Sequence, residues 1–108
     1  FRQHALNLPL PVTVTSNDLP HLGAAIEVAA YRIAVEALTN VVRHSRATSA
    51  ALTLMAGPHS LTVEVVDDGM IAAPWRPGTG ITSMRERAAL VGGTLLAADG
   101  RTVATLPL

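Results

Sequence analysis

The stretch AAIEVAAYRIAVEALTNVVRHS, residues 24–45, decides how the rest of the chain can fold. Apolar residues stand at nearly every position and the run is too long for a strand, so it predicts a mostly buried α-helix. Its polar side chains gather on one side. Because each residue advances about 100° around a helix axis, five of them share roughly one third of the circumference. These five are Arg32, Glu36, Asn40, Arg43 and His44.

This polar stripe has two interpretations. The commoner reason for such a stripe is that it forms the solvated side of an amphipathic helix. A solvated face usually carries Lys and Glu at several turns, whereas here an Asn replaces a better helix former in mid-helix. Glu36, Asn40 and Arg43 lie on successive turns, where they could serve as base, metal ligand and anion ligand.

On the N-terminal side of this helix, LPLPVTVT (residues 8–15) predicts an edge strand, because it alternates weakly and contains two prolines. The segment SNDLP (16–20) predicts a turn and a helix start, with Asn17 or Asp18 able to cap. On the C-terminal side, residues 50–55 and 61–66 predict two strands, joined by a hairpin turn at Gly57-Pro58.

A glycine-containing loop follows at residues 67–80, and then a second helix is predicted from about Ile81 to Val91, ended by Gly92-Gly93. Residues 94–98 and 102–106 predict a last hairpin around Asp99-Gly100. This order predicts an α+β fold. We expect a two-layer sandwich, in which helices cover one face of a mixed, mostly antiparallel sheet of about five strands.

Composition narrows the classes of function. The chain has 108 residues, 49% of them hydrophobic and 15% charged, which suits one domain with a real core. The formal net charge of zero argues against a nucleic-acid binder but leaves small anions such as nucleotides open. Cysteine is absent, and no apolar run approaches the roughly 20 residues that span a bilayer. We therefore expect a cytoplasmic domain without membrane contact of its own.

Two loop motifs add candidate binding residues. The segment VVDDG (65–69) places two carboxylates where an apolar strand ends. They form either an ordinary acidic turn or a group that accepts a hydrogen bond from a ligand amine. Gly78-Thr79-Gly80 leads into the second helix, whose N-terminal backbone N–H groups favour an anion. Neither a Walker loop nor a dinucleotide fingerprint is present.

Together these segments resemble the ATPase fold shared by DNA gyrase, heat-shock chaperones, bacterial histidine kinases and mismatch-repair ATPases. The specific resemblance is to the catalytic, ATP-binding domain of bacterial two-component sensor histidine kinases with short lids. YRIAVEALTNVVRHS (31–45) is similar to its asparagine box, VVDDG to its first glycine box, and GTGITSMRERAALVGG (78–93) to its second. The boxes stand in the family's order, so residues 1–108 are expected to be one such domain, excised from its sensor and phosphoacceptor regions.

The resemblance implies that the chain binds ATP with Mg²⁺. It assigns Asn40 to the Mg²⁺ ion and Glu36 to orienting the attacking group or accepting its proton. Arg43 would contact phosphate, with His44 beside it. Asp67 would accept a hydrogen bond from the adenine amino group, and Gly69 would let the base approach. The positions implied for the lid and the phosphates are Gly78, Thr79, Gly80 and Ile81.

In the full-length protein, the resemblance implies transfer of the γ-phosphoryl group of ATP to a histidine on a dimerisation helix. The implied partners are the phosphoacceptor helices of the same protein and a downstream response regulator. The family's first glycine box continues Gly-x-Gly, but here the second glycine is replaced by Ile71, a β-branched residue that resists positive φ. A degenerate, non-catalytic regulatory domain therefore stays open as an alternative, as does an anti-sigma-factor serine kinase on the same fold.

Overall fold

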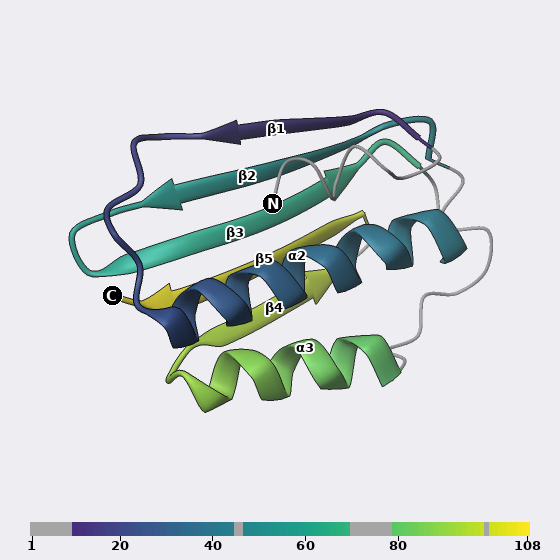
Figure 1. Cartoon of the computed structure of the whole chain (residues 1–108). Coiled ribbons are helices and arrows are strands. Elements are labelled where there is room, and N and C mark those ends of the chain that lie inside the picture. Colours follow the sequence, from purple (N-terminus) through teal and green to yellow (C-terminus); the bar gives the residue numbers. More distant parts are fainter. Residues whose placement is uncertain (1–9, 45–46, 70–78, 99) are drawn as a thin grey trace.

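A computed structural model of the chain describes residues 10–44, 47–69, 79–98 and 100–108 (Figure 1). Within those ranges, no helix is both long and apolar enough to cross a bilayer. The elements follow in the order β1 (Val12–Ser16), α2 (Ala24–His44), β2 (Ala50–Ala56), β3 (Ser60–Asp67), α3 (Thr79–Leu90), β4 (Thr94–Ala98) and β5 (Arg101–Pro107).

The five strands form one sheet in the order β1-β2-β3-β5-β4, which leaves β3 at the centre. β1 and β2 run parallel, and α2 supplies the crossover that a parallel pair needs. The other three pairs are antiparallel, two of them joined by short hairpins. The predicted α+β class and the mixed, mostly antiparallel sheet are confirmed.

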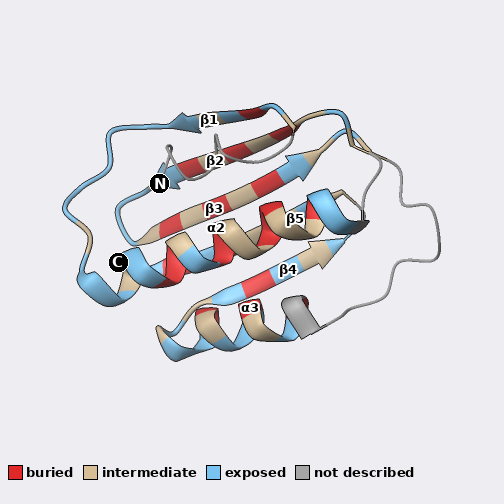
Figure 2. Ribbon diagram, turned by 45° about the vertical axis from the view of Figure 1, so that its right-hand side comes forward, coloured by how far each residue is buried: buried red, intermediate tan, exposed pale blue. Residues whose placement is uncertain are grey.

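Both helices cover the same face of the sheet (Figures 1 and 2). Because strand side chains alternate between faces, Leu61, Val63 and Val65 of β3 are buried on the helix side. Glu64 and Val66 point to the opposite face, where Glu64 is half-buried and Val66 is 37% exposed. The alternation fixes which end-of-strand residues can face the helices, and this decides the geometry of the candidate site.

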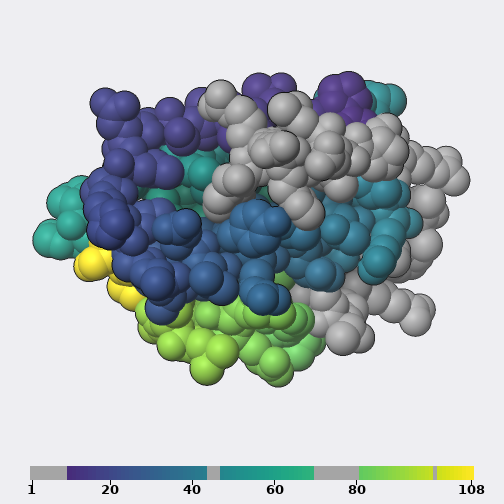
Figure 3. Space-filling model, in the orientation of Figure 1, coloured from purple at the N-terminus to yellow at the C-terminus, as the bar shows by residue number. Residues whose placement is uncertain are grey.

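Alanine dominates the side of α2 that meets the sheet. Ala30, Ala34 and Ala37 are at most 2% exposed. Since an alanine side chain ends at Cβ, the helix axis can approach the sheet closely, and branched side chains from the strands fill the remaining space. Figure 3 shows α2 and α3 side by side across this face. The largest fully buried side chains are Ile33, Leu52, Leu61, Val63, Met84 and Leu106.

Glycines end α3 and close the last hairpin, as predicted. The N–H of Gly93 donates to the carbonyl of Ala88 (2.8 Å) and the N–H of Gly92 donates to that of Ala89 (2.9 Å), which is the Schellman pattern of a helix end. Gly92 has the positive φ of 80° that this pattern requires. Gly100 has a φ of 76° in the β4–β5 turn, while its predicted turn partner Asp99 lies outside the described residues.

The first helix begins at the predicted residue, but its predicted cap was wrong. α2 begins at Ala24, and the carbonyl of Gly23 accepts a hydrogen bond from the N–H of Glu27 (2.9 Å), so neither Asn17 nor Asp18 caps it. Asn17 has another role. Its side-chain amide donates to the carbonyl of Ala56 (2.8 Å), and its Oδ1 accepts from the N–H of the same residue (2.9 Å). The amide thereby prolongs the pairing of β1 with β2.

The predicted first strand also began too early. β1 starts at Val12, not at residue 8, and residues 8 and 9 lie outside the described ranges. Pro11 directly precedes the strand and has no N–H to give to a ladder, although its carbonyl accepts a bond from Ala50 (3.1 Å). The proline therefore marks the point at which regular pairing begins.

Candidate functional site

The polar stripe of α2 lies along the border between its buried face and solvent. Arg32 and Arg43 are exposed, as a solvated face would require, but Glu36 and Asn40 are half-buried. Within the described part of the chain, neither Glu36 nor Asn40 makes a side-chain hydrogen bond or an ion pair. A half-buried amide and carboxylate without an internal partner keep their hydrogen-bonding capacity for a ligand or for water.

His44 and the glycine-rich segment are described only in part. His44 is the last residue of α2, and its side chain is outside the description, as are the surroundings of Thr79 and Gly80. Gly78 lies outside the described residues altogether. α3 begins at Thr79 rather than near Ile81, so Gly80 sits in the first helical turn instead of before it.

Ile81 is buried. It is 6% exposed and packs in the core. What this part of α3 can offer to an anion is its backbone, because the first N–H groups of a helix have no partners within the helix. The predicted contacts of Gly78, Thr79, Gly80 and Ile81 with phosphate stay predictions.

Asp67 ends β3, the central strand, and strand alternation places it on the helix-covered face with Val63 and Val65. One carboxylate oxygen, Oδ1, accepts a hydrogen bond from the N–H of Gly69 (2.8 Å), which turns the chain and fixes the orientation of the side chain. The backbone N–H of Asp67 donates to the carbonyl of Gly100 (3.0 Å). The side chain is half-buried.

Two of the predicted residues, Asn40 and Asp67, lie toward the same end of the molecule. β3 ends, α2 ends and α3 begins at the same end, as Figures 1 and 2 both show. Asn40 lies about one turn before the end of α2, and Asp67 is the last residue of β3 on the face that α2 covers. Amide and carboxylate groups from two distant parts of the sequence therefore share one face and one end of the fold.

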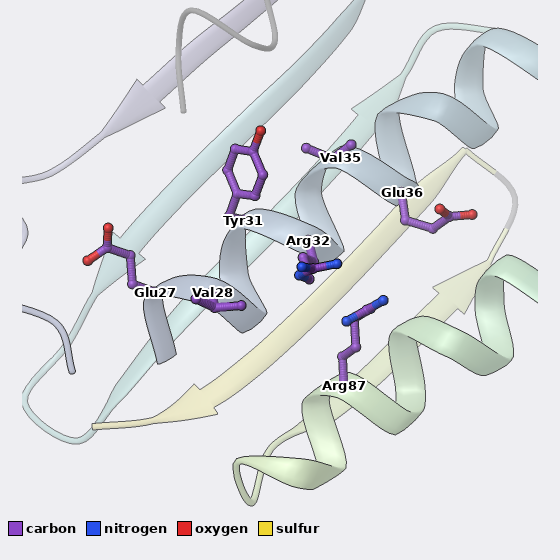
Figure 4. A pocket seen from close by; sticks show the side chains of 7 residues that line it. All are labelled: Glu27, Val28, Tyr31, Arg32, Val35, Glu36 and Arg87. Atoms are coloured by element: carbon purple, nitrogen blue, oxygen red, sulfur yellow. The ribbon is translucent and has the colours of Figure 1, made fainter. Parts of the chain in front are cut away.

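A groove of about 560 Å³ runs along the outer side of α2 toward α3. Arg87 extends from α3 toward α2, Arg32 projects from α2 beside it, and Glu36 points toward the end where α3 begins (Figure 4). Among the predicted site residues whose side chains are described, only Glu36 borders this groove, so the groove flanks the site and does not include Asp67, the predicted purine acceptor. Its lining is Glu27, Val28, Tyr31, Arg32, Val35, Glu36 and Arg87.

Asp68 is a structural residue that sequence reasoning did not single out. Its two carboxylate oxygens accept hydrogen bonds from the backbone and hydroxyl groups of Thr48 and Ser49. The hydrogen bond from the Thr48 hydroxyl, followed by those from the two backbone N–H groups, lowers the pKa of Asp68 from 3.8 to about 2. The signal was absent from the linear sequence, because Asp68 and Thr48 become neighbours only through the pairing of β2 with β3.

No family model matches the chain. Curated relatives do. The chain is 43% identical to the sensor histidine kinase YxjM of Bacillus subtilis over 65 residues, which is 60% of the chain. It is 38% identical to YvfT, another sensor histidine kinase of that organism, over 77 residues, which is 68% of the chain. It is 34% identical over 80 residues (72% of the chain) to UhpB of Salmonella typhimurium, a signal transduction histidine-protein kinase/phosphatase. The matches span only 16–21% of these relatives' lengths.

Solved structures share the fold. The histidine kinase domain of the blue-light-activated kinase of Erythrobacter litoralis EL346 superposes with a TM-score of 0.71 over 99% of this chain and 55% of that one, at 21% identity. The Acinetobacter baumannii histidine kinase AdeS gives a TM-score of 0.71 over 100% of this chain and 58% of that one, at 14% identity. At these identities the superpositions show the fold alone.

The sheet, its covering helices and the sequence relatives define one class of protein. The chain belongs to the sensor histidine kinases of two-component systems and has the fold of their ATPase domain.

Proposed function

We propose that this domain binds Mg-ATP and, within its full-length protein, presents the γ-phosphoryl group to a histidine of a dimerisation helix. The observation that carries the proposal is the juxtaposition at one end of the fold. Asn40, near the end of α2, and Asp67, at the end of β3, lie at the same end, and the half-buried side chains of Asn40 and Glu36 have no side-chain partner in the described ranges. Such a site suits ATP, because a carboxylate at one side can accept a hydrogen bond from the purine amine. Hard oxygen ligands and cationic groups at the other side can bind the triphosphate and its metal ion.

On this proposal the purine lies over the end of β3. Asp67 accepts a hydrogen bond from the adenine amino group, in an orientation set by its bond with Gly69. Gly69 has no side chain to keep the base at a distance. The hydrogen-bond acceptor selects adenine over a purine that carries a carbonyl oxygen in the same place, because two acceptors would then face each other.

The phosphates lie toward the end of α2 and the first turn of α3. Arg43 is exposed on the last turn of α2 and can turn to the phosphates, with His44 following it. The backbone N–H groups of the first α3 residues add donors and the favourable end of a helix dipole. Glu36, one turn before Asn40, orients the attacking imidazole or accepts its proton.

The donor set fits Mg²⁺. The amide oxygen of Asn40 is a hard ligand of the kind that this ion accepts. No three His, Asp or Glu side chains of the described residues gather as a ready-made metal cage, which suits an ion that reaches the site mainly on the phosphates of its nucleotide. When bound, Mg²⁺ neutralises charge on the phosphate oxygens and so eases phosphoryl transfer.

The remaining parts of the reaction lie outside this domain. The relatives are several times longer than the stretch they share with the chain, so the phosphoacceptor helices of the same protein and a downstream response regulator are the proposed partners. We propose a cytoplasmic location for the domain, because ATP and the response regulator are found there.

Calorimetric titration of the domain with ATP in the presence of Mg²⁺ tests the proposal. We expect a Kd between micromolar and millimolar for the natural domain, and loss of binding in Asn40→Ala and in Asp67→Asn. Glu64→Gln is the control, because Glu64 lies on the opposite face of the sheet, where it pairs with Arg101 (2.6 Å). Absence of nucleotide binding by well-folded natural protein with Mg²⁺ would overturn the proposal.

A second candidate function rests on Ile71, which lies outside the described residues. If the β-branched side chain prevents the lid from closing, the domain acts as a regulatory module through protein contacts. Ile71→Gly separates the two accounts. An inert natural protein together with an ATP-binding Ile71→Gly variant would favour the degenerate module, whereas equal binding by both would favour the nucleotide-binding domain.

A further inference from the structure

β3 ends in two neighbouring acids that the fold uses for different purposes. Asp67 follows the parity of Val63 and Val65 and stays on the helix-covered face. Asp68, one residue later, leaves the sheet in the other direction and is exposed. The two carboxylates are therefore not interchangeable, although they are adjacent in the sequence.

Asp68 is engaged by a complete set of donors. Its Oδ1 accepts the backbone N–H groups of Thr48 (2.8 Å) and Ser49 (3.1 Å). Its Oδ2 accepts the hydroxyl groups of the same two residues, at 2.6 Å and 3.2 Å. The backbone N–H of Asp68 also donates to the carbonyl of Ser49 (3.3 Å). Hydrogen bonds to a charged carboxylate are shorter and stronger than those between neutral groups.

These bonds join two chain segments that leave the candidate site. Thr48 and Ser49 follow the last residue of α2, His44, by four and five positions and lead into β2. Since consecutive Cα atoms are about 3.8 Å apart, a fixed Thr48 limits how far the end of α2 can move. Asp68 is covalently linked to Asp67, so its bonds tie the end of α2 to the end of β3.

We propose that Asp68 is a positioning residue, which holds the phosphate-binding end of α2 in register with the purine-binding end of β3. The inference rests on the proposed nucleotide site, whose metal ligand Asn40 lies on one of these segments and whose purine acceptor Asp67 lies on the other. Asp68 itself does not touch the nucleotide. It acts through Thr48 and Ser49 on the geometry between the two groups.

The hydrogen bonds of Asp68 add to the stability of the domain, but its side chain is not part of the framework that forms the fold. Asp68 lies beyond the last ladder pair of β2 and β3, Ala50 with Asp67, and it is not part of the hydrophobic core. Its side chain contributes neither to the ladder pairs of the sheet nor to the core contacts. We therefore expect Asp68 variants to fold, with a changed junction between α2 and β2.

Two substitutions at Asp68 are expected to affect the Kd for Mg-ATP to different extents. Asp68→Ala removes all four side-chain bonds, and we expect the Kd for Mg-ATP to rise roughly tenfold, as for the loss of an outer-shell support of a metal ligand. Asp68→Asn keeps one oxygen for the two backbone N–H groups, and its amide can donate to the hydroxyls of Thr48 and Ser49, which can also accept. We expect this variant to bind within about threefold of the natural domain.

A structural defect and a positioning defect differ in their response to Mg²⁺. If Asp68 aligns Asn40 with Asp67, then Asp68→Ala should reduce the gain in ATP affinity that Mg²⁺ gives over EDTA, while the Mg²⁺-free affinity changes less. Arg101→Ala is the matched control, because it removes an exposed ion pair with Glu64 on the far face. It should leave both affinities unchanged. Both sets of titrations are done on protein whose thermal unfolding shows a folded population.

The outcomes separate the two proposals. Natural protein that binds no Mg-ATP would overturn the proposed function, and the positioning role with it. Natural protein that binds, with Asp68→Ala binding equally well and with an equal Mg²⁺ effect, would overturn the positioning role alone. Should Asp68→Ala fail to fold, the pair Thr48→Val and Ser49→Ala removes only the two hydroxyl donors. An unchanged Kd in that double variant would also overturn it.

Discussion

Single residues in this protein take their roles from the direction in which the backbone points them. Asp67 and Asp68 have the same side chain and adjacent positions. Asp67 faces the helices, whereas Asp68 accepts hydrogen bonds from Thr48 and Ser49 just before β2. Glu36 and Asn40 differ from Arg32 and Arg43 in the same way, because a rotation around α2 of less than one turn separates half-buried from exposed positions.

The lowered pKa of Asp68 predicts an acid-sensitive contribution to stability. The folded pKa of about 2 lies below the ordinary value of 3.8, so the contribution is fully present above about pH 4 and is lost as the pH falls toward 2. Thermal unfolding midpoints measured between pH 2 and pH 7 should therefore fall less steeply for Asp68→Asn than for the natural protein. Parallel profiles would show that the four hydrogen bonds leave the carboxyl titration unchanged.

At the scale of elements, the end of α3 depends on two glycines for different reasons. Gly92 supplies the positive φ of the helix end, whereas Gly93 supplies space. A Cβ added at Gly93 would lie 2.5 Å from the carbonyl oxygen of Thr105 and 2.8 Å from Cδ2 of Leu106, both shorter than a real contact permits. The backbone of the α3–β4 turn and the strand β5 would have to separate.

We therefore predict that Gly93→Ala destabilises the domain by about 1–3 kcal/mol, the usual cost of overpacking. Denaturant unfolding measures the change. Gly57→Ala is the matched control, because the nearest atom to its added Cβ is 3.8 Å away and its φ is not positive. Equal stability of Gly93→Ala and the natural protein would mean that β5 can shift without cost.

At the scale of the whole molecule, the layer of small residues on α2 sets the distance between helices and sheet. Ala34 is fully buried where α2 meets the core. We predict that Ala34→Leu costs about 1–3 kcal/mol, because the extra side chain forces α2 away from the strands. Ala25→Leu, on the exposed first turn, should be nearly neutral. Thermal and denaturant unfolding of the two variants compare them, and similar losses in both would contradict the close packing.

The same displacement should reach the candidate site, since Asn40 is carried by α2 and Asp67 by β3. Ala34→Leu should therefore bind Mg-ATP more weakly than Ala25→Leu does under conditions where both are folded. The packing of α2 on the sheet therefore sets the distance between Asn40 and Asp67. It holds two polar groups from separate layers at one end of a sandwich whose class is that of sensor histidine kinase ATPase domains.

Much of the fold could be predicted because local patterns agree with it. The long apolar helix, the Gly57-Pro58 turn and the Gly92-Gly93 helix end each carry their signal within a few residues. The errors occurred where a residue found a distant partner. Asn17 was predicted to cap a helix but bonds to Ala56, which lies 39 positions away.

The candidate site likewise has features that local sequence patterns predicted and features that depend on distant partners. The sequence motifs identified Glu36, Asn40, Asp67 and the glycines as candidate site residues. The resemblance to histidine kinases implied that these residues assemble into one site. The roles of their neighbours were not readable. Nothing near Asp68 in the sequence distinguishes it from Asp67, and Arg87 becomes a neighbour of α2 only when α3 packs beside it.

The sequence by itself determined the elements of this protein and the polar groups that they carry, because helix periodicity, strand alternation and glycine turns act over a few residues. Only the tertiary structure decided which carboxylate faces the helices, which one ties α2 to β3, and which arginine crosses from α3 to α2. Those assignments depend on strand register and on layer packing. Both bring together residues that are far apart along the chain, and so no local pattern records them.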